Sequence, residues 1–279
     1  NIKFLNTMQF NTSGQDNGFI WGEPFSNKRL LRGNIPAKKS SFYIKGDIPD
    51  PGLFLAETLS EILSSNGIEV NEITTTRKAY YENMYTLVPV LNNENKEMCY
   101  AHSSPALKDI IRVVNVRSNN HYAEHLIRTI GRKQNPDIYS EPLKEGINYI
   151  HAFWKGKRID TGGLFMYDGS GLSPSNALNS ALLCDMLRYM YTQSKNSDAF
   201  IASLPKTGKS GTVRNLLKGT KLEGKLLVKS GSIANVQCYA GYYIDGENEY
   251  VFAVMVNNFK PDTRKEVIKA IEAFLSEVF

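Results

Sequence analysis

The chain has 279 residues, of which 42% are hydrophobic and 22% are charged, and its formal net charge is +5. This length can bury a full core, either in one large domain or in one large and one small domain. No run approaches the roughly 18 apolar residues that a membrane span requires, so no transmembrane helix is predicted. Because the chain begins with Asn1 rather than Met and shows no signal peptide, we expect upstream sequence to be missing.

The first 48 residues are rich in Asn, Gly and Ser. Short stretches of alternating polar and apolar residues, such as residues 41–45, predict short strands joined by turns. Pro49 and Pro51 then disfavour regular structure. We therefore expect a small β-rich accessory segment over residues 1–48 and a second domain over residues 49–279.

The apolar spacing changes at Pro51, from where apolar residues recur every three or four positions and predict a helix that ends near Asn66 and Gly67. Four further helices are predicted over residues 106–116, 123–130, 143–154 and 177–191, the second of them closing at Gly131. β-Branched and aromatic residues predict strands over residues 226–229, 236–244 and 250–256, with a hairpin at 245–248. A last amphipathic helix presents five apolar residues on one face: Val267, Ile268, Ile271, Leu275 and Val278. This order of elements predicts an α+β fold.

A polar break, Ser118–Asn120, separates two of the predicted helices. Such a break can project a hydroxyl and an amide into a cleft. The alternative is a simple Ser or Asn helix cap, and the Ser-x-Asn pattern also occurs at Ser64–Asn66 and Ser194–Asn196. The pattern therefore has meaning only through its context.

The pattern Lys-Ser/Thr-Gly occurs three times, at Lys206–Gly208, Lys209–Gly211 and Lys229–Gly231. Only the third copy continues a predicted strand and precedes a hairpin. A lysine and a hydroxyl at a strand edge can bind a peptide, and Gly231 leaves room for that peptide to lie alongside as an additional strand. We take the third copy as the functional one.

The segment Ser203–Ser210 resembles a phosphate-binding loop, but it lacks the leading glycine and follows a helix rather than a strand. Ser203 and Lys206 also match Ser-x-x-Lys formally, with Pro205 between them. This copy lies after Ser118, and no Ser-x-x-Lys precedes Ser118 in the chain. A nucleophilic serine of this kind is therefore not found in the chain.

Two further patterns favour ordinary interpretations. His121–His125 matches the His-x-x-Glu-His pattern of inverted zinc peptidases, but no third ligand can be assigned uniquely, so we favour surface histidines on a helix. Cys99, Cys184 and Cys238 show no Cys-x-x-Cys spacing. The sequence predicts no metal site, no cofactor and no disulfide framework.

Basic residues are concentrated over residues 206–229, where seven cations meet one acid, Glu223. This segment is either a solvated basic loop, which we favour, or a funnel for an anionic substrate. No aromatic residue interrupts it, which argues against binding of single-stranded nucleic acid by stacking.

Together these motifs resemble the class C low-molecular-mass penicillin-binding proteins, which are D-alanyl-D-alanine carboxypeptidases/endopeptidases of the DacB type. Ser118–Asn120 resembles the second motif of that family, and Lys229–Ser232 resembles the third. The most specific match is Tyr167–Ser173, which reads Tyr-Asp-Gly-Ser-Gly-Leu-Ser. The resemblance runs from about residue 51 to residue 279 and more weakly over residues 1–48, which would be the end of the accessory domains that the family inserts between its first and second motifs. Ser230 stands where the family more usually has Thr.

The resemblance implies an incomplete penicillin-recognising domain, similar to serine β-lactamases and transpeptidases, with an antiparallel sheet, helices and a nucleophilic Ser-x-x-Lys that lies outside this chain. Ser118 would relay a proton to the leaving amine with the help of Lys229, and Asn120 would hydrogen-bond a substrate carbonyl. Lys229 and Ser230 would bind the terminal carboxylate, and the Ser232 N–H would form half of the oxyanion hole.

The implied partners are peptidoglycan stem peptides and β-lactam antibiotics, met in the periplasm or another extracytoplasmic space. Without the nucleophile, we expect residues 1–279 alone to be inactive. The alternatives are a non-catalytic homologue that binds wall peptides and, less favoured, a zinc peptidase.

Overall fold

A computed structural model describes residues 2–279 except residues 13, 15, 24–25, 40, 71–96, 99 and 138. The chain forms two compact units, Asn1–Tyr100 and Ala101–Phe279. These units divide later than the boundary that we expected at residues 48 and 49, so the first helix falls in the first unit. The assignment of residues 49–100 to a domain of the whole protein stays a prediction.

The first unit contains short strands, as predicted. In a three-stranded sheet, β4 (Lys28–Arg32) pairs in parallel with β1 (Lys3–Asn6) and antiparallel with β3 (Phe19–Trp21). A second, two-stranded sheet pairs β2 (Gln9–Asn11) in parallel with β5 (Asn34–Pro36).

The expected strand over residues 41–45 is wrong, because these residues form no regular element. Alternation places side chains on two faces, but a strand also needs a neighbour that accepts its hydrogen bonds. The chain is held instead at Asp47, whose carboxylate pairs with the buried guanidinium of Arg29 at 3.0 Å. Helix α1 (Pro51–Ser65) then begins where Asp50 caps the amide of Leu53, as the apolar spacing predicted.

The second unit is built on a three-stranded antiparallel sheet. Strand β7 (Val236–Asp245) lies between β6 (Leu226–Ile233) and β8 (Asn248–Asn257). Asp245 pairs with Asn248, which confirms the predicted hairpin.

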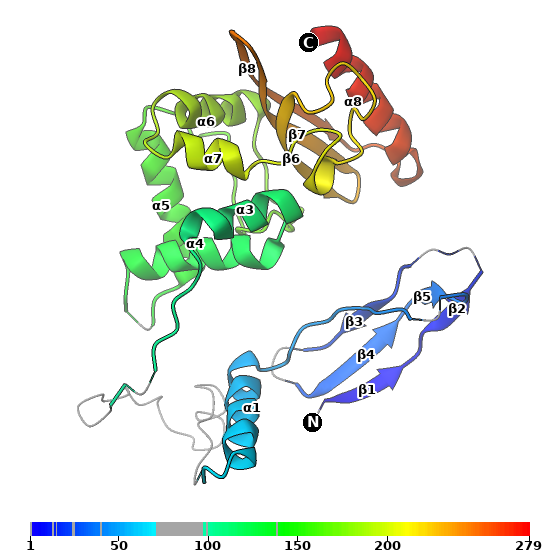
Figure 1. Cartoon of the computed structure of the whole chain (residues 1–279), viewed down its shortest axis with the longest axis vertical. Helices are drawn as coiled ribbons and strands as arrows, with labels where there is room; N and C mark the ends of the chain where they lie inside the picture. Colours follow the sequence, from blue (N-terminus) through cyan, green and yellow to red (C-terminus); the bar gives the residue numbers. More distant parts are fainter. Residues whose placement is uncertain are drawn as a thin grey trace. The chain divides into compact units, whose positions relative to one another are not determined.

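Helices pack on both faces of this sheet (Figure 1). None of the described helices is long and apolar enough to cross a membrane. Their bounds are α3 Leu107–Arg117, α4 Asn120–Gln134, α5 Pro142–Gly156, α6 Ser180–Thr192, α7 Ser197–Ser203 and α8 Arg264–Val278, with short 3₁₀ turns η1 at Gly211–Val213 and η2 at Pro261–Thr263.

The two faces of the sheet bury different clusters. On one face, Val228 packs with Ile271 and Leu275 of α8, and on the other, Leu227 and Tyr242 pack against α6 and α7. Side chains of successive residues in a strand point to opposite faces, so Lys229 emerges on the same side as Leu227. This places its ammonium on the face of the sheet that α6 and α7 cover.

We expected helix α4 to end at Gly131, but it continues to Gln134. A Cβ at Gly131 would lie 1.8 Å from the carbonyl oxygen of Pro142, and one at Gly146 would lie 2.2 Å from that of Ile127. Both glycines therefore allow the backbones of α4 and α5 to approach closely. Gly131 is needed for helix packing rather than for a helix end.

Candidate active site

The polar break between α3 and α4 gives each of its residues a different position. Ser118 ends α3 in the left-handed conformation, with φ at 50°, and its N–H bonds to the Val114 carbonyl. Asn119 caps α4, because its side chain accepts a hydrogen bond from the amide of Tyr122 at 2.9 Å. The sequence left open whether this segment only caps a helix. The capping residue is Asn119, so the hydroxyl of Ser118 is available for other contacts.

Lys229 meets Ser118 across the second unit. Its Nζ donates a hydrogen bond to Ser118 Oγ at 3.0 Å and another to the carbonyl oxygen of Ser230. The structure thus confirms that the hydroxyl at the helix break and the ammonium on the sheet face one another. Burial lowers the pKa of Lys229. Among the described residues no carboxylate forms an ion pair with this lysine, so no negative charge there offsets the effect of burial on the pKa.

Ser230 follows Lys229 in β6, and its hydroxyl contacts the loop before the strand. It shares a hydrogen bond with Thr212 Oγ1 at 2.7 Å, and Thr212 belongs to η1. We did not predict Thr212 as a site residue from the sequence. Only its position before the third motif could have indicated it.

Strand β6 has an edge that is covered along only part of its length. The Val228 N–H bonds to Pro205 O at 2.9 Å, and the Thr207 N–H bonds to Leu226 O at 3.0 Å. Along a strand, the backbone N–H and C=O groups of every second residue point to the same edge. Those of Ser230 and Ser232 therefore point to the same edge as those of Val228, away from β7. No described strand pairs with them there. A Cβ at Gly231 would meet only Cys238 at 3.7 Å, so the face of the strand is uncrowded at this residue.

The turn between β6 and β7 is held by Arg264 at the start of α8. Its guanidinium donates to Ser232 Oγ and to the Ala234 carbonyl, and to Gln237 Oε1 at 3.0 Å. These bonds fix the strand that carries the Ser232 N–H. Nothing in the sequence around residue 264 indicated this contact.

Asn120 follows the helix cap. It is the first residue of α4 and is exposed. No hydrogen bond joins its side-chain amide to any described residue. Its role toward a substrate therefore stays a prediction.

The other two Lys-Ser/Thr-Gly copies are structural. Thr207 is buried and donates to Leu222 O at 2.9 Å, while Ser210 Oγ accepts from the amide of Lys206 at 3.0 Å. These side chains hold the loop beside β6. The third copy is the one that reaches Ser118.

Ser203, the formal Ser-x-x-Lys serine, is also structural. It is 1% exposed at the end of α7, where its hydroxyl donates to Phe200 O and accepts from Asn115 Nδ2 at 2.7 Å. Leu204 then adopts an extended conformation, so Ser203 and Lys206 do not share a helical turn. This arrangement fits neither a nucleophile nor a phosphate-binding loop.

The loop over residues 167–173 is anchored at Asp168. Its carboxylate accepts hydrogen bonds from the amides of Gly171 and Ser173, each at 2.7 Å, and from Asn176 Nδ2 at 2.9 Å. Burial acts to raise the pKa of Asp168, but the bonds from Asn176, Ser173 and Gly171 outweigh it and hold the pKa below its usual value.

Glu124 joins this loop to α4. Its Oε2 accepts from the Gly169 amide at 2.8 Å, and its Oε1 pairs with Arg128 at 2.7 Å. Both oxygens of the glutamate in the His-x-x-Glu-His pattern are thus engaged away from His121 and His125. Among the described residues, no three His, Cys, Asp or Glu side chains group so that they could hold a metal ion.

Two of the three cysteines can be located. Cys184 on α6 and Cys238 on β7 are free thiols, and burial raises the pKa of both. Cys99 lies outside the described residues.

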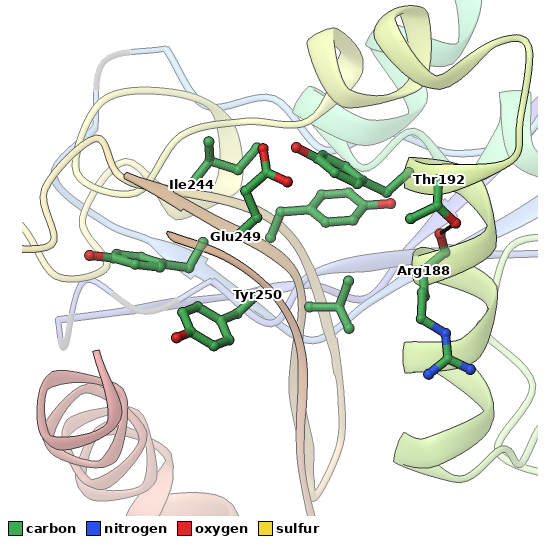
Figure 2. Close-up of a pocket in the computed structure, with 9 residues that line it drawn as sticks. Arg188, Thr192, Ile244, Glu249 and Tyr250 are labelled. Atoms are coloured by element: carbon green, nitrogen blue, oxygen red, sulfur yellow. Dashed lines mark hydrogen bonds between the residues drawn. The ribbon is translucent and has the colours of Figure 1, made fainter. Parts of the chain in front are cut away.

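A separate pocket of about 250 Å³ lies between α6 and the hairpin end of β7 and β8 (Figure 2). Arg188 and Thr192 from α6 face Glu249 and Tyr250 from β8 across it. The pocket shares no lining residue with the Ser118–Lys229 pair. It therefore forms no part of the candidate active site.

Known proteins of one family are similar to this chain along nearly its whole length. The sequence model of the D-Ala-D-Ala carboxypeptidase 3 (S13) family matches residues 11–278. A D-alanyl-D-alanine carboxypeptidase from Actinomadura sp. (strain R39) is 26% identical over 271 residues, which are 95% of this chain and 48% of the relative. Penicillin-sensitive carboxypeptidase A from Dictyostelium discoideum is 25% identical over 255 residues, covering 88% of this chain and 46% of the relative.

Among solved structures, penicillin binding protein 4 (dacB) from Haemophilus influenzae, complexed with a β-lactam, matches with a TM-score of 0.77 at 18% identity. The match covers 100% of this chain and 63% of that one. This likeness confirms the predicted fold class. The chain spans about half the length of the curated relatives it matches.

Proposed function

The chain belongs to the D-Ala-D-Ala carboxypeptidase 3 (S13) family, and from this premise we propose that its Ser118–Lys229 pair serves a serine-type D-alanyl-D-alanine carboxypeptidase or endopeptidase. The single observation that carries the proposal is the hydrogen bond from Lys229 Nζ to Ser118 Oγ. It joins the second and third motifs of an acyl-transfer site on one side of the sheet.

The reaction begins with a nucleophilic serine from a Ser-x-x-Lys segment outside residues 1–279. Its Oγ attacks the carbonyl carbon between the last two residues of the peptide and passes its proton to its own lysine. The carbonyl oxygen becomes an oxyanion. Collapse of this intermediate breaks the C–N bond and leaves an acyl ester on the serine, which water later hydrolyses.

Ser118 is suited to protonate the departing amine. Because Lys229 is the donor in their hydrogen bond, the proton on Ser118 Oγ stays free to point toward the leaving nitrogen. The lowered pKa of Lys229 then favours return of a proton from its ammonium to Ser118. Asn120, at the start of α4, would hold the amide carbonyl of the peptide.

The edge of β6 is suited to bind the rest of the substrate. The outward N–H of Ser232 supports an oxyanion-hole role, and removal of such a donor typically costs about 3 kcal/mol. Lys229 and the Ser230 hydroxyl would bind the carboxylate next to the scissile bond. Gly231 lets the peptide lie close to the strand.

The substrates proposed for the whole protein are peptidoglycan stem peptides, and β-lactams would acylate the same serine. An enzyme that acts on the cell wall works outside the cytoplasm. We therefore place the protein in the periplasm or an equivalent extracytoplasmic space.

The first experiment measures binding of an N-acylated D-alanyl-D-alanine peptide to the 279-residue chain by calorimetry. Charge-assisted hydrogen bonds are worth about 1.5 to 3 kcal/mol, so Lys229→Met should weaken binding roughly tenfold or more. Lys195→Met removes an exposed ammonium outside the site and should leave the affinity unchanged. Absence of binding, or binding that Lys229→Met does not alter, would contradict the proposal.

The second experiment uses a fluorescent penicillin. The 279-residue chain should not be labelled, whereas the complete gene product should be, and Ser118→Ala should slow its acylation by about 10²- to 10⁴-fold. Ser180→Ala, at the first turn of α6, is the matched control. Labelling of any serine within residues 1–279 would show that the nucleophile has been misplaced.

A further inference from the structure

A polar pocket of about 390 Å³ lies beside the candidate active site, where η1 meets the end of α3. Gly211 makes this junction possible, because a Cβ there would lie 2.5 Å from the Val116 carbonyl oxygen. The pocket is lined by Val116, Arg117, Gly211, Thr212, Arg214 and Asn215.

Two arginines dominate the charge of this pocket. Arg117 and Arg214 are both exposed, and neither guanidinium group forms an ion pair or a hydrogen bond with the described residues. Two lysines of the basic segment are paired, Lys209 with Glu223 at 2.5 Å and Lys225 with Asp245 at 2.6 Å, whereas Lys206, Lys218 and Lys221 form no ion pair among the described residues. Of the cations without an ion pair, Arg117 and Arg214 are the two that line this pocket.

The pocket is continuous with the residues proposed to bind substrate. Thr212 lines it and also shares a hydrogen bond with Ser230 Oγ at 2.7 Å. Arg117 directly precedes Ser118 in the chain. A substrate whose first carboxylate lies against Lys229 and Ser230 therefore has its leaving group next to this pocket.

We propose that the pocket is a subsite for a leaving group that carries a second carboxylate, beyond the one beside the scissile bond. This inference rests on the proposed function. Guanidinium groups bind carboxylates through paired N–H donors, and no described acid competes for these two. A terminal D-alanine has a single carboxylate and would leave the subsite empty. The geometry thus favours cleavage that releases an acidic amino acid or a longer acidic peptide.

The test compares three N-acylated dipeptides on the full chain: D-alanyl-D-glutamate, its neutral isostere D-alanyl-D-glutamine, and D-alanyl-D-alanine. Exposed ion pairs contribute up to about 1 kcal/mol each, so the glutamate peptide should bind about five- to tenfold more tightly than the glutamine peptide. Raising the salt concentration should reduce this preference. The double variant Arg117→Gln/Arg214→Gln should abolish it while leaving the affinity for the glutamine peptide unchanged, which also shows that the variant is folded.

Arg112→Gln and Lys221→Gln together make the matched control, since they remove two exposed cations from the same segments outside the pocket and should keep the preference. Equal binding of the glutamate and glutamine peptides to the parent chain would overturn the subsite while leaving the proposed function intact. A preference that survives in the double arginine variant would also overturn it. If none of the three peptides binds, the proposed function fails, and the subsite with it.

Discussion

The ammonium of Lys229 donates a hydrogen bond to Ser118 Oγ at 3.0 Å, although 111 residues separate them in the chain. The serine comes from the junction of two helices, and the lysine comes from the face of an antiparallel sheet that α6 and α7 cover. The lysine reaches this position without a carboxylate partner among the described residues, so its charge is held at a cost in hydration. The burial that lowers the pKa of Lys229 for proton transfer therefore also lowers the stability of the folded protein.

The stability difference between the parent protein and the variant Lys229→Met should therefore depend on pH. A lysine whose pKa is lowered on folding binds fewer protons in the folded state than in the unfolded state, so the parent protein gains stability as pH rises from the lowered pKa toward about 10.5. The variant lacks this gain. Thermal unfolding should show the parent improving relative to Lys229→Met over this range.

Lys195→Met controls for the change in net charge, because it removes an exposed ammonium. A stability difference between parent and Lys229→Met that does not change with pH would contradict the account of a buried, unpaired charge.

Gly131→Ala should destabilise the second unit. Its Cβ would lie 1.8 Å from the Pro142 carbonyl oxygen, and the α4–α5 backbones must separate to admit it. Overpacking of this kind costs about 1 to 3 kcal/mol, which urea unfolding can measure. Gly156→Ala adds a Cβ with no atom within 4 Å and is the matched control. Equal stability of the two variants would refute the close helix contact.

Asp168→Asn should loosen the loop over residues 167–173. The change removes the negative charge that accepts from two amides and from Asn176, and we expect a loss of about 1 to 2 kcal/mol at neutral pH, moderated by partial exposure. Because folding lowers the pKa of Asp168, its contribution is present above about pH 4 and is lost as pH falls through the lowered value. The gap between parent and variant should therefore narrow in acid.

Asp160→Asn is the control for that experiment, since Asp160 accepts only one hydrogen bond from the described residues, from the amide of Gly162 at 2.9 Å. If both variants lose the same stability at every pH, the network around Asp168 has no special contribution.

Arg264→Gln should free the turn between β6 and β7. The guanidinium holds Ser232, Ala234 and Gln237 together, and its loss removes these bonds without touching the Ser118–Lys229 pair. Hydrogen exchange at the amides of residues 232–236 should become faster, by about tenfold for each 1.4 kcal/mol of lost local stability. Lys265→Gln, one residue further along α8, should leave exchange at the turn unchanged.

Local patterns were sufficient for most elements of the second unit. The period of apolar residues located α3, α4, α5, α6 and α8 but not the short α7, and the turn residues located the β7–β8 hairpin. The same reasoning was wrong where an element depended on a distant partner. Residues 41–45 alternate but have no strand beside them, and Gly131 serves contact with α5 rather than a helix end.

For the site residues too, the sequence could indicate those in local motifs but not those that depend on contacts between distant segments. Its motif lysine and serine could be selected from the sequence because the strand context distinguished the third copy from the other two. Thr212, Arg214 and Arg264 could not be selected, since nothing local separates a pocket arginine from any other exposed cation. Their significance depends on which loop packs against α3 and on which helix end meets the turn.

By itself the sequence determined the types of secondary structure, the α+β class and the two motifs, because these follow from residue spacing within a few turns or a single strand. Only the tertiary structure decided that Ser118 rather than Asn119 faces the lysine, and that two unpaired arginines share a pocket beside them. The physical reason is that hydrogen bonds and charge pairing act over a few ångströms in space, and the packing of α3, η1 and β6 sets those distances between residues far apart in the chain.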